Sequence, residues 1–276
     1  MLRSGALTTV RRGVYVEGGQ PDDATARHAL LVRAAVAELD ASAVVSHFSA
    51  AALHGLPLWG PALDVVQVTR DRSRSGSRRG SCVHVYCAPL SPDEITVVDG
   101  VVCTTVAKTV ADMARTLPFE HAVVTADAAL RGGLGRPVLA EALRRVRGWP
   151  GAPVARRVAA FADARSESVG ESRSRVAIAL AGLPAPALQW AVRYGGTTAR
   201  ADFGWVAQRV VGEFDGKVKY GRLLRPGQQP GDVVFAEKLR EDSIRAQDWE
   251  MARWTWFDLG DFRPTAERIR QRFRSA

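Results

Sequence analysis

Three acidic residues in the second half of the chain have the types and the spacing of a metal site. Asp202 lies in one short stretch, Glu213 and Asp215 lie in the next, and the two stretches read as strands joined by a tight turn. Residues two apart on a strand face the same side, so Glu213 and Asp215 are expected to project together. Carboxylates that converge repel one another unless a cation lies between them, and hard oxygen ligands suit Mg²⁺ or Mn²⁺. The spacing therefore predicts a divalent metal site held by Asp202, Glu213 and Asp215.

The residues around Asp215 also fit a simple turn. An acid at a strand end followed by Asp215-Gly216 is a common turn signal, because Asp and Gly accept the positive φ angles that tight hairpins need. On these residues alone, a metal site and a turn both stay open.

The same stretch resembles the PD-(D/E)xK nuclease fold, and most closely its very-short-patch-repair-like branch. The resemblance rests on Asp202, on Glu213-Phe214-Asp215-Gly216, on a preceding helix that carries Glu171 and on a following helix around Glu237 to Met251. It covers about residues 165–276. It implies a central mixed sheet flanked by helices, Mg²⁺ or Mn²⁺ as the cofactor of an active enzyme, and metal-dependent hydrolysis of DNA.

The resemblance also implies roles within the site. Asp202 and Glu213 would hold the metal, Glu171 would assist, and a lysine two residues after the second acid would orient water. Asp215 occupies that lysine position in this chain. Either Lys217 or Lys219 could substitute for the missing lysine, or the site binds metal without cleaving. The candidate catalytic residues are Glu171, Asp202, Glu213, Asp215 and Lys217.

Arginine dominates the positive charge of the chain. There are 38 Lys and Arg against 29 Asp and Glu, which gives a formal net charge of +9. Guanidinium groups match phosphate oxygens, so a polyanionic partner, DNA or RNA, is expected, with DNA as the partner that the nuclease resemblance implies; a codon preference for arginine is the alternative explanation. The segment from Arg70 to Gly80 is rich in Arg, Ser and Gly and is expected to be a mobile basic loop along the phosphate backbone. The candidate DNA-contacting residues are Arg11, Arg12, Arg70, Arg72, Arg74, Arg78, Arg79, Lys219, Lys238, Arg240 and Arg245.

The first half of the chain resembles AbiEi-type antitoxins in two places. Arg11-Arg12-Gly13-Val14-Tyr15 looks like the wing of a winged helix, although the helices that precede a wing, including the recognition helix, are absent. The stretch from Ser46 to Pro57 looks like the middle region of that family and reads as a short helix with marked ends. This resemblance implies the alternative function, a non-catalytic DNA-binding regulator of a type IV toxin–antitoxin system with a nearby toxin as partner.

The pattern of strands and helices predicts an α/β (α+β) fold in three parts. Residues 1–20 form an incomplete wing-like hairpin, residues 21–150 a mixed α/β region and residues 151–276 the nuclease-like domain. The main boundary is expected at the turn-rich stretch from Gly148 to Pro153.

The remaining reactive residue types show no site pattern. Cys82, Cys87 and Cys103 lack the spacing of zinc ligands and are expected to be reduced. The five histidines are scattered and are assigned to packing or to the surface, while Asp112 and Asp127 are assigned to exposed or helix-capping positions. No stretch has the length of a transmembrane helix or the apolar run of a signal peptide, so a cytoplasmic location is expected.

Overall fold

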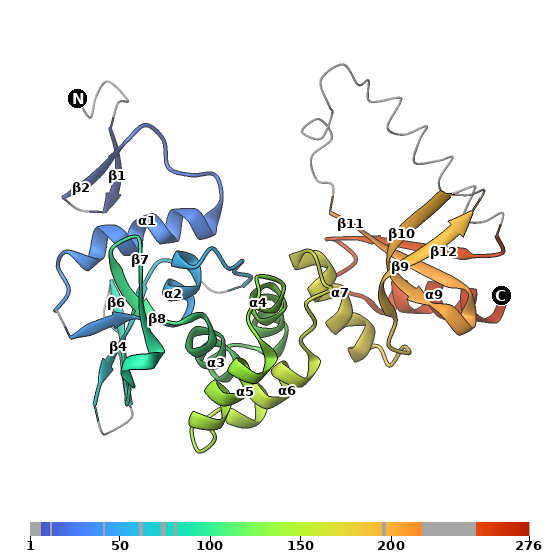
Figure 1. Ribbon diagram of the computed structural model, residues 1–276. Coiled ribbons are helices and arrows are strands. Elements are labelled where there is room, and N and C mark those ends of the chain that lie inside the picture. Colours follow the sequence, from blue (N-terminus) through green and yellow to red (C-terminus); the bar gives the residue numbers. More distant parts are fainter. Residues whose placement is uncertain are drawn as a thin grey trace. The chain divides into compact units, whose positions relative to one another are not determined.

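The structure is a computed structural model that describes residues 7–11, 13–40, 42–60, 63–72, 76–79, 82–194, 197–216 and 247–275. The chain divides into two compact units, Met1–Ala164 and Arg165–Ala276 (Figure 1). Each unit combines helices with a mixed sheet, so the fold class is mixed α/β. The candidates that lie outside the described residues are Arg12, Arg74, Lys217, Lys219, Lys238, Arg240 and Arg245.

The first unit begins with an antiparallel hairpin of β1 (Leu7–Arg11) and β2 (Val14–Glu17). Gly13, at φ 82°, takes the left-handed conformation between the strands. The hairpin expected around Gly13 is therefore confirmed. Helix α1 (Ala24–Val36) follows, and the carboxylate of Asp23 caps it by accepting a backbone hydrogen bond of 2.8 Å from its first turn.

A six-stranded mixed sheet forms the centre of the first unit. Its strand order is β5-β6-β4-β3-β8-β7, in which β4–β6 and β3–β8 are parallel pairs and the other pairs are antiparallel. The strands are β3 (Ala43–Val45), β4 (Val66–Asp71), β5 (Gly76–Arg79), β6 (Val83–Ala88), β7 (Ile95–Val98) and β8 (Val101–Thr104). The β7–β8 hairpin turns through Asp99 and Gly100, both at positive φ, which confirms the predicted turn.

Helices complete the first unit. Apolar side chains of α1, of α2 (His47–Leu53) and of the sheet share one core. Four further helices pack on one another: α3 (Val106–Thr116), α4 (Phe119–Arg131), α5 (Arg136–Arg145) and α6 (Ala152–Phe161). Helix α6 contacts α3, α4 and α5 and belongs to the first unit, so the boundary follows Ala164 and not, as expected, the turn-rich stretch ahead of α6.

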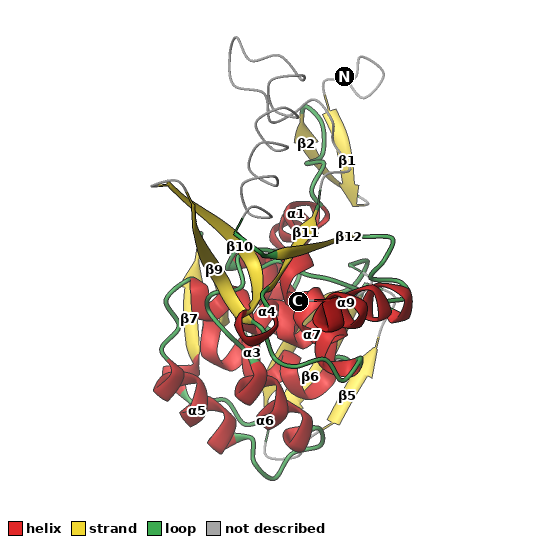
Figure 2. Cartoon of the chain, turned by 90° about the vertical axis from the view of Figure 1, so that its right-hand side faces the viewer, coloured by secondary structure: helices red, strands yellow, loops and turns green. Residues whose placement is uncertain are grey.

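In the described part of the second unit, a four-stranded mixed sheet carries two helices on one face. The strand order is β12-β11-β10-β9, and only the β11–β12 pair is parallel. In chain order the elements are α7 (Val169–Leu180), β9 (Ala187–Tyr194), β10 (Thr197–Trp205), β11 (Val210–Asp215), β12 (Glu250–Thr255) and α9 (Arg263–Ser275). Side chains from both helices and all four strands form one core, so α7 and α9 cover the same face of the sheet (Figure 2).

Two expectations about elements are wrong. Arg70 lies inside β4, and β5 contains Arg78 and Arg79, so the stretch from Arg70 to Gly80 is not a single loop. Met251 lies in β12, opposite Val211 of β11, and not in a helix. Pairing with other strands fixes these segments, β5 with β6 and β12 with β11, and the composition of a segment alone does not report such pairing. Among the described residues, no helix has the length and hydropathy that crossing a bilayer requires.

Candidate functional site

The predicted acids lie on adjacent strands of the second unit. The register pairs Phe203 of β10 with Gly212 of β11, so Asp202 and Glu213 occupy the next position along the two strands. Oδ2 of Asp202 accepts a hydrogen bond of 2.8 Å from the backbone N–H of Phe214. The structure therefore brings the Asp202 carboxylate to the peptide that joins Glu213 to Phe214.

Strand β9 is irregular opposite Asp202. Gln189 has φ 54°, in the left-handed region that residues other than glycine seldom adopt. The β9–β10 pairing skips the position of Gln189 and Asp202, although the pairs on both sides of it form. The side-chain Nε2 of Gln189 donates a hydrogen bond of 2.8 Å to Oε2 of Glu171 on α7. Gln189 thus connects the strand position opposite Asp202 to the predicted helix acid.

Glu171 forms a helix cap. Its Oε1 accepts a hydrogen bond of 2.8 Å from the hydroxyl of Ser168, and its Oε2 accepts one of 2.9 Å from the N–H of Glu167. Oγ of Ser168, the N-cap of α7, in turn accepts from the N–H of Glu171 at 3.1 Å. Both carboxylate oxygens of Glu171 are therefore engaged at the start of α7.

Glu213 is buried and faces a cation from the neighbouring strand. Nε of Arg253 lies 3.2 Å from Oε2 of Glu213. Phe214 packs against α7 so closely that a Cβ at Gly170 would lie 1.8 Å from its ring. Because side chains alternate along a strand, Glu213 and Asp215 point to the side of β11 away from α7. Among the described residues, no group of three or more His, Cys, Asp or Glu side chains is arranged to hold a metal, so the structure does not gather the three acids into one cluster.

The described basic candidates lie in the first unit. Arg11 at the end of β1 forms an ion pair of 2.6 Å with Glu38. Arg72 follows the end of β4, and β5, with Arg78 and Arg79, is an edge strand of the six-stranded sheet.

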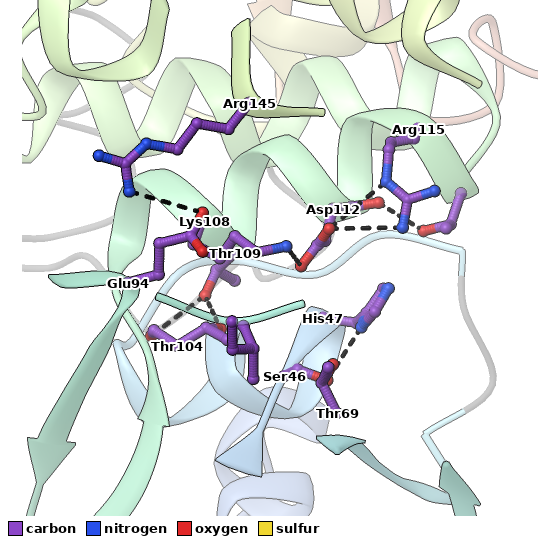
Figure 3. A network of polar contacts seen from close by, with 12 residues as sticks. Ser46, His47, Thr69, Glu94, Thr104, Lys108, Thr109, Asp112, Arg115 and Arg145 are labelled. Carbon is purple, nitrogen blue, oxygen red and sulfur yellow. Dashed lines mark hydrogen bonds and ion pairs between the residues drawn. The ribbon is translucent and has the colours of Figure 1, made fainter. Parts of the chain in front are cut away.

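Residues outside the predicted set form a second polar site within the first unit. Lys108 and Asp112 of α3 are both buried, and Nζ of Lys108 lies 2.7 Å from Oδ2 of Asp112 (Figure 3). Nε of Arg115 lies 3.4 Å from Oδ1 of the same carboxylate. Both cations lie 5.0 Å from the ring centroid of Trp149.

The sequence assignments of Asp112 and Asp127 are wrong. Asp112 is compensated inside the unit by Lys108 and Arg115, and Asp127 is buried with Oδ1 accepting a hydrogen bond of 2.8 Å from the N–H of Asp163. A signal for the first network is visible in the sequence. Lys108, Asp112 and Arg115 stand four and three residues apart, the spacing at which charged side chains meet on a helix.

Comparison with known proteins identifies relatives but no family. No family model matches the chain. The uncharacterized proteins MT2308 and Rv2248, from two strains of Mycobacterium tuberculosis, are each 38% identical to it over 120 residues. The match covers 43% of this chain and 44% of each relative, so the chain aligns with less than half the length of these proteins.

Proposed function

We propose that this chain is a DNA-binding protein whose second unit has a PD-(D/E)xK-like nuclease fold and hydrolyses phosphodiester bonds with a divalent metal. The order of elements supports the proposal: α7, the antiparallel strands β9 to β11, then β12 parallel to β11, and α9. The resemblance implies such a helix-flanked mixed sheet. The observation that carries the proposal is the Asp202 carboxylate held at the peptide beside Glu213.

The chemistry of the donors suits Mg²⁺ or Mn²⁺. Asp202 and Glu213 offer hard carboxylate oxygens from neighbouring strands, and Mg²⁺ commonly uses one or two carboxylates together with water and substrate phosphates. A metal bound there supplies a Lewis acid and a water of lowered pKa. Glu171 acts in this proposal as a positioning residue, because its carboxylate fixes Gln189 opposite Asp202. The net charge of +9 favours the approach of a polyanionic substrate.

Plasmid cleavage tests the nuclease proposal. The protein is incubated with supercoiled plasmid and Mg²⁺, Mn²⁺ or EDTA, beside Asp202→Asn and Glu213→Gln. Each variant removes one anionic ligand, so each is expected to lose roughly 100-fold or more of the metal-dependent nicking. Asp261→Asn is the matched control, because Asp261 is an exposed carboxylate of the same unit, 2.8 Å from Arg263. Nicking that persists in both site variants contradicts the proposal.

A second candidate function is a non-catalytic DNA-binding regulator, such as the antitoxin of a type IV toxin–antitoxin system with a toxin encoded nearby. Two observations favour it. Arg253 already lies 3.2 Å from the Glu213 carboxylate, and Asp215 stands at the position of the catalytic lysine. If this is the function, the protein binds the plasmid without cutting it, and Asp202→Asn does not change the binding.

A further inference from the structure

A pocket of about 260 Å³ lies within the first unit, apart from the acids of the second. Its volume is close to the range of small-molecule sites, about 300–1,000 Å³. The walls come from the start of α2, from β4 and β6, from the end of α3 and from the turn before α6. The residues that line it include His47, Thr69, Tyr86, Cys87, Asp112, Arg115 and Trp149.

His47 has an unusual backbone conformation in this pocket, and its ring stacks on a neighbouring aromatic ring. It is the first residue of α2, and its φ is 51°, a conformation that only a few per cent of residues other than glycine adopt. Its side chain is 2% exposed and stacks on Tyr86 with ring centroids 3.7 Å apart and an angle of 16°. Strained backbone of this kind persists where the surroundings enforce it, and it is concentrated at functional sites.

The hydrogen bonds of His47 determine which of its ring nitrogens carries the proton. The hydroxyl of Thr69 donates to Oγ of Ser46 at 2.8 Å, and Oγ of Ser46 lies 3.0 Å from Nδ1 of His47 (Figure 3). The hydroxyl hydrogens of Thr69 and Ser46 both have an acceptor if Ser46 donates to Nδ1 of His47. Nδ1 is then an acceptor, so the ring hydrogen of a neutral His47 lies on Nε2. Burial keeps the ring neutral by lowering the pKa of His47 to about 3.

The Nε2–H group of His47 is a buried donor that lacks an acceptor. Within the described part of the chain, Nε2 has no hydrogen-bond partner. Such groups are rare in folded proteins, because an unpaired buried donor loses its bond to water and gains nothing in return. Figure 3 shows this nitrogen on the side of the ring away from Ser46, where Asp112 and Arg115 lie. A ligand acceptor in the pocket would satisfy it.

The charges beside the pocket favour an anion. Lys108 and Arg115 provide two cations, and Asp112, the carboxylate between them, provides one negative charge. Arg115 also donates from Nη1 to the carbonyl of Pro150 at 3.1 Å, which keeps its guanidinium at the pocket wall. A cationic ligand would add to an excess of positive charge, and a metal at Nε2 would require the ring hydrogen to move to Nδ1, which accepts from Ser46 in the tautomer above.

We propose that this pocket binds a small organic anion, whose carboxylate or phosphate accepts a hydrogen bond from Nε2–H of His47 and faces Arg115. The apolar part of the ligand packs against Trp149 and the edge of the Tyr86 ring, which line the same pocket. The site is independent of the acids on β10 and β11, so the nuclease proposal can fail while this one stands.

A series of benzene derivatives with matched shape tests the ligand class. Binding of benzoate, phenyl phosphate, benzamide and benzamidine is measured by titration calorimetry. Benzoate or phenyl phosphate is expected to bind, and the tighter of the two tells whether a carboxylate or a phosphate is preferred. Neutral benzamide is expected to bind at least tenfold more weakly and cationic benzamidine not at all. Failure of both anions to bind at millimolar concentration, or binding of benzamidine, overturns the proposal.

Two variants of His47 test the role of its free N–H. Asn keeps a polar group near the position of Nδ1 and tolerates positive φ, but it has nothing at the position of Nε2. His47→Asn is therefore expected to weaken anion binding about tenfold or more. The longer side chain of Gln can place an N–H donor near the position of Nε2. His47→Gln should therefore keep more of the anion affinity than His47→Asn. Equal anion affinity in His47→Asn and the unchanged protein overturns the assignment.

Cys87 gives a readout that does not depend on any variant. It lines the pocket and is partly exposed, whereas Cys82 is exposed elsewhere and Cys103 is buried. The bound anion is expected to slow alkylation of Cys87 severalfold in the unchanged protein. Peptide analysis after proteolysis gives the rate at Cys82 in the same sample, and this rate is the internal control. Equal rates at Cys87 with and without saturating anion contradict binding in this pocket.

Discussion

At the scale of single residues, Asp112 carries a charge in the interior of the first unit. Burial raises the pKa of a carboxyl group, but the charges beside Asp112 outweigh this and hold its pKa below its ordinary value. Its ion pair with Lys108, at 2.7 Å, is almost without exposure. A buried pair of this kind adds little net stability, yet loss of one member leaves the other charge uncompensated.

Asp112→Asn is therefore expected to lower the free energy of unfolding by roughly 3–5 kcal/mol. The double variant Lys108→Met with Asp112→Leu should cost less, because no charge of the pair remains. Glu141→Gln is the control, since Glu141 pairs with Arg144 at 2.7 Å on the surface and is expected to change stability little. Urea unfolding at neutral pH measures all three variants, and equal losses for Asp112→Asn and Glu141→Gln contradict the prediction.

His47 is expected to make the fold sensitive to mild acid. The folded pKa is lowered to about 3 by burial, with Asp112, Lys108, Arg115 and His84 as the charged and titratable neighbours. The His47 side chain takes up a proton near pH 6.5 in the unfolded chain but not in the folded chain. Its contribution to the free energy of unfolding is therefore complete above pH 6.5 and declines as the pH falls toward 3. The decline is at most about 1.4 kcal/mol per pH unit.

Urea unfolding at pH 7.5, 6 and 5 measures this loss. His47→Asn removes the titrating group. The slope of the unfolding free energy against pH should therefore decrease by the equivalent of nearly one proton. The remaining slope includes His28, whose pKa burial also lowers. The same slope in His47→Asn and the unchanged protein would mean that His47 titrates alike in both states.

At the scale of elements, the turn between α5 and α6 holds one wall of the pocket against α3. Gly151 has φ 81°, and a Cβ there would lie 2.0 Å from the carbonyl oxygen of Arg115. That atom belongs to the backbone of α3 and cannot swing aside. The turn therefore requires glycine at this position, both for its conformation and for the close approach.

Gly151→Ala is expected to cost more than about 1 kcal/mol of stability and to weaken anion binding, since the turn that carries Trp149 must shift. Gly148→Ala in the same turn is the matched control. Its φ lies outside the left-handed region, and a Cβ there has no atom within 4 Å, so a change of at most about 0.5 kcal/mol is expected. Equal melting points for the two variants contradict the prediction.

Elements with local signals could be predicted from the sequence, and elements fixed by distant partners could not. The end of the short helix from His47 follows from Gly55 at φ 68°, and the Asp99-Gly100 hairpin follows from its turn residues, although Ser46 makes no side-chain capping bond at the start of that helix. The strand containing Met251 was missed because its register is set by β11, far away in the sequence. Adjacent acids on β10 and β11 were predictable from two short strands joined by a tight turn, whereas engagement of Glu213 by Arg253 depends on the parallel pairing of β11 with β12.

The second polar site shows the same limit. Helical spacing brings Lys108, Asp112 and Arg115 together, but nothing local shows that α3 is buried on that face. The positive φ of His47 and the lack of an acceptor for its Nε2–H group arise from tertiary packing, and neither is visible in the sequence. Single residues of ordinary type therefore form the pocket, and only the folded chain reveals it.

At the scale of the whole molecule, the two units have separate cores. The core of the first unit joins α1, α2 and the six-stranded sheet, and the core of the second joins α7, α9 and the four-stranded sheet. Multi-domain chains commonly depart from two-state unfolding for this reason.

Calorimetry is expected to resolve two unfolding transitions. Gly151→Ala should lower the midpoint of one, and Gly170→Ala, where a Cβ would lie 1.8 Å from the Phe214 ring, should lower the other. The shift is expected to be roughly 2–8 °C for each kcal/mol lost. A single transition that both variants move would show that the two cores unfold together.

Tyr86 lies between two imidazole rings, with His47 3.7 Å away on one face and His84 4.2 Å away on the other. A phenol ring stacked on both faces rotates about its axis only when its neighbours separate. The two edges of the ring then keep distinct magnetic environments, and its ring protons give separate signals, shifted upfield by the flanking rings. The temperature at which those signals merge reports how often this wall of the first unit opens.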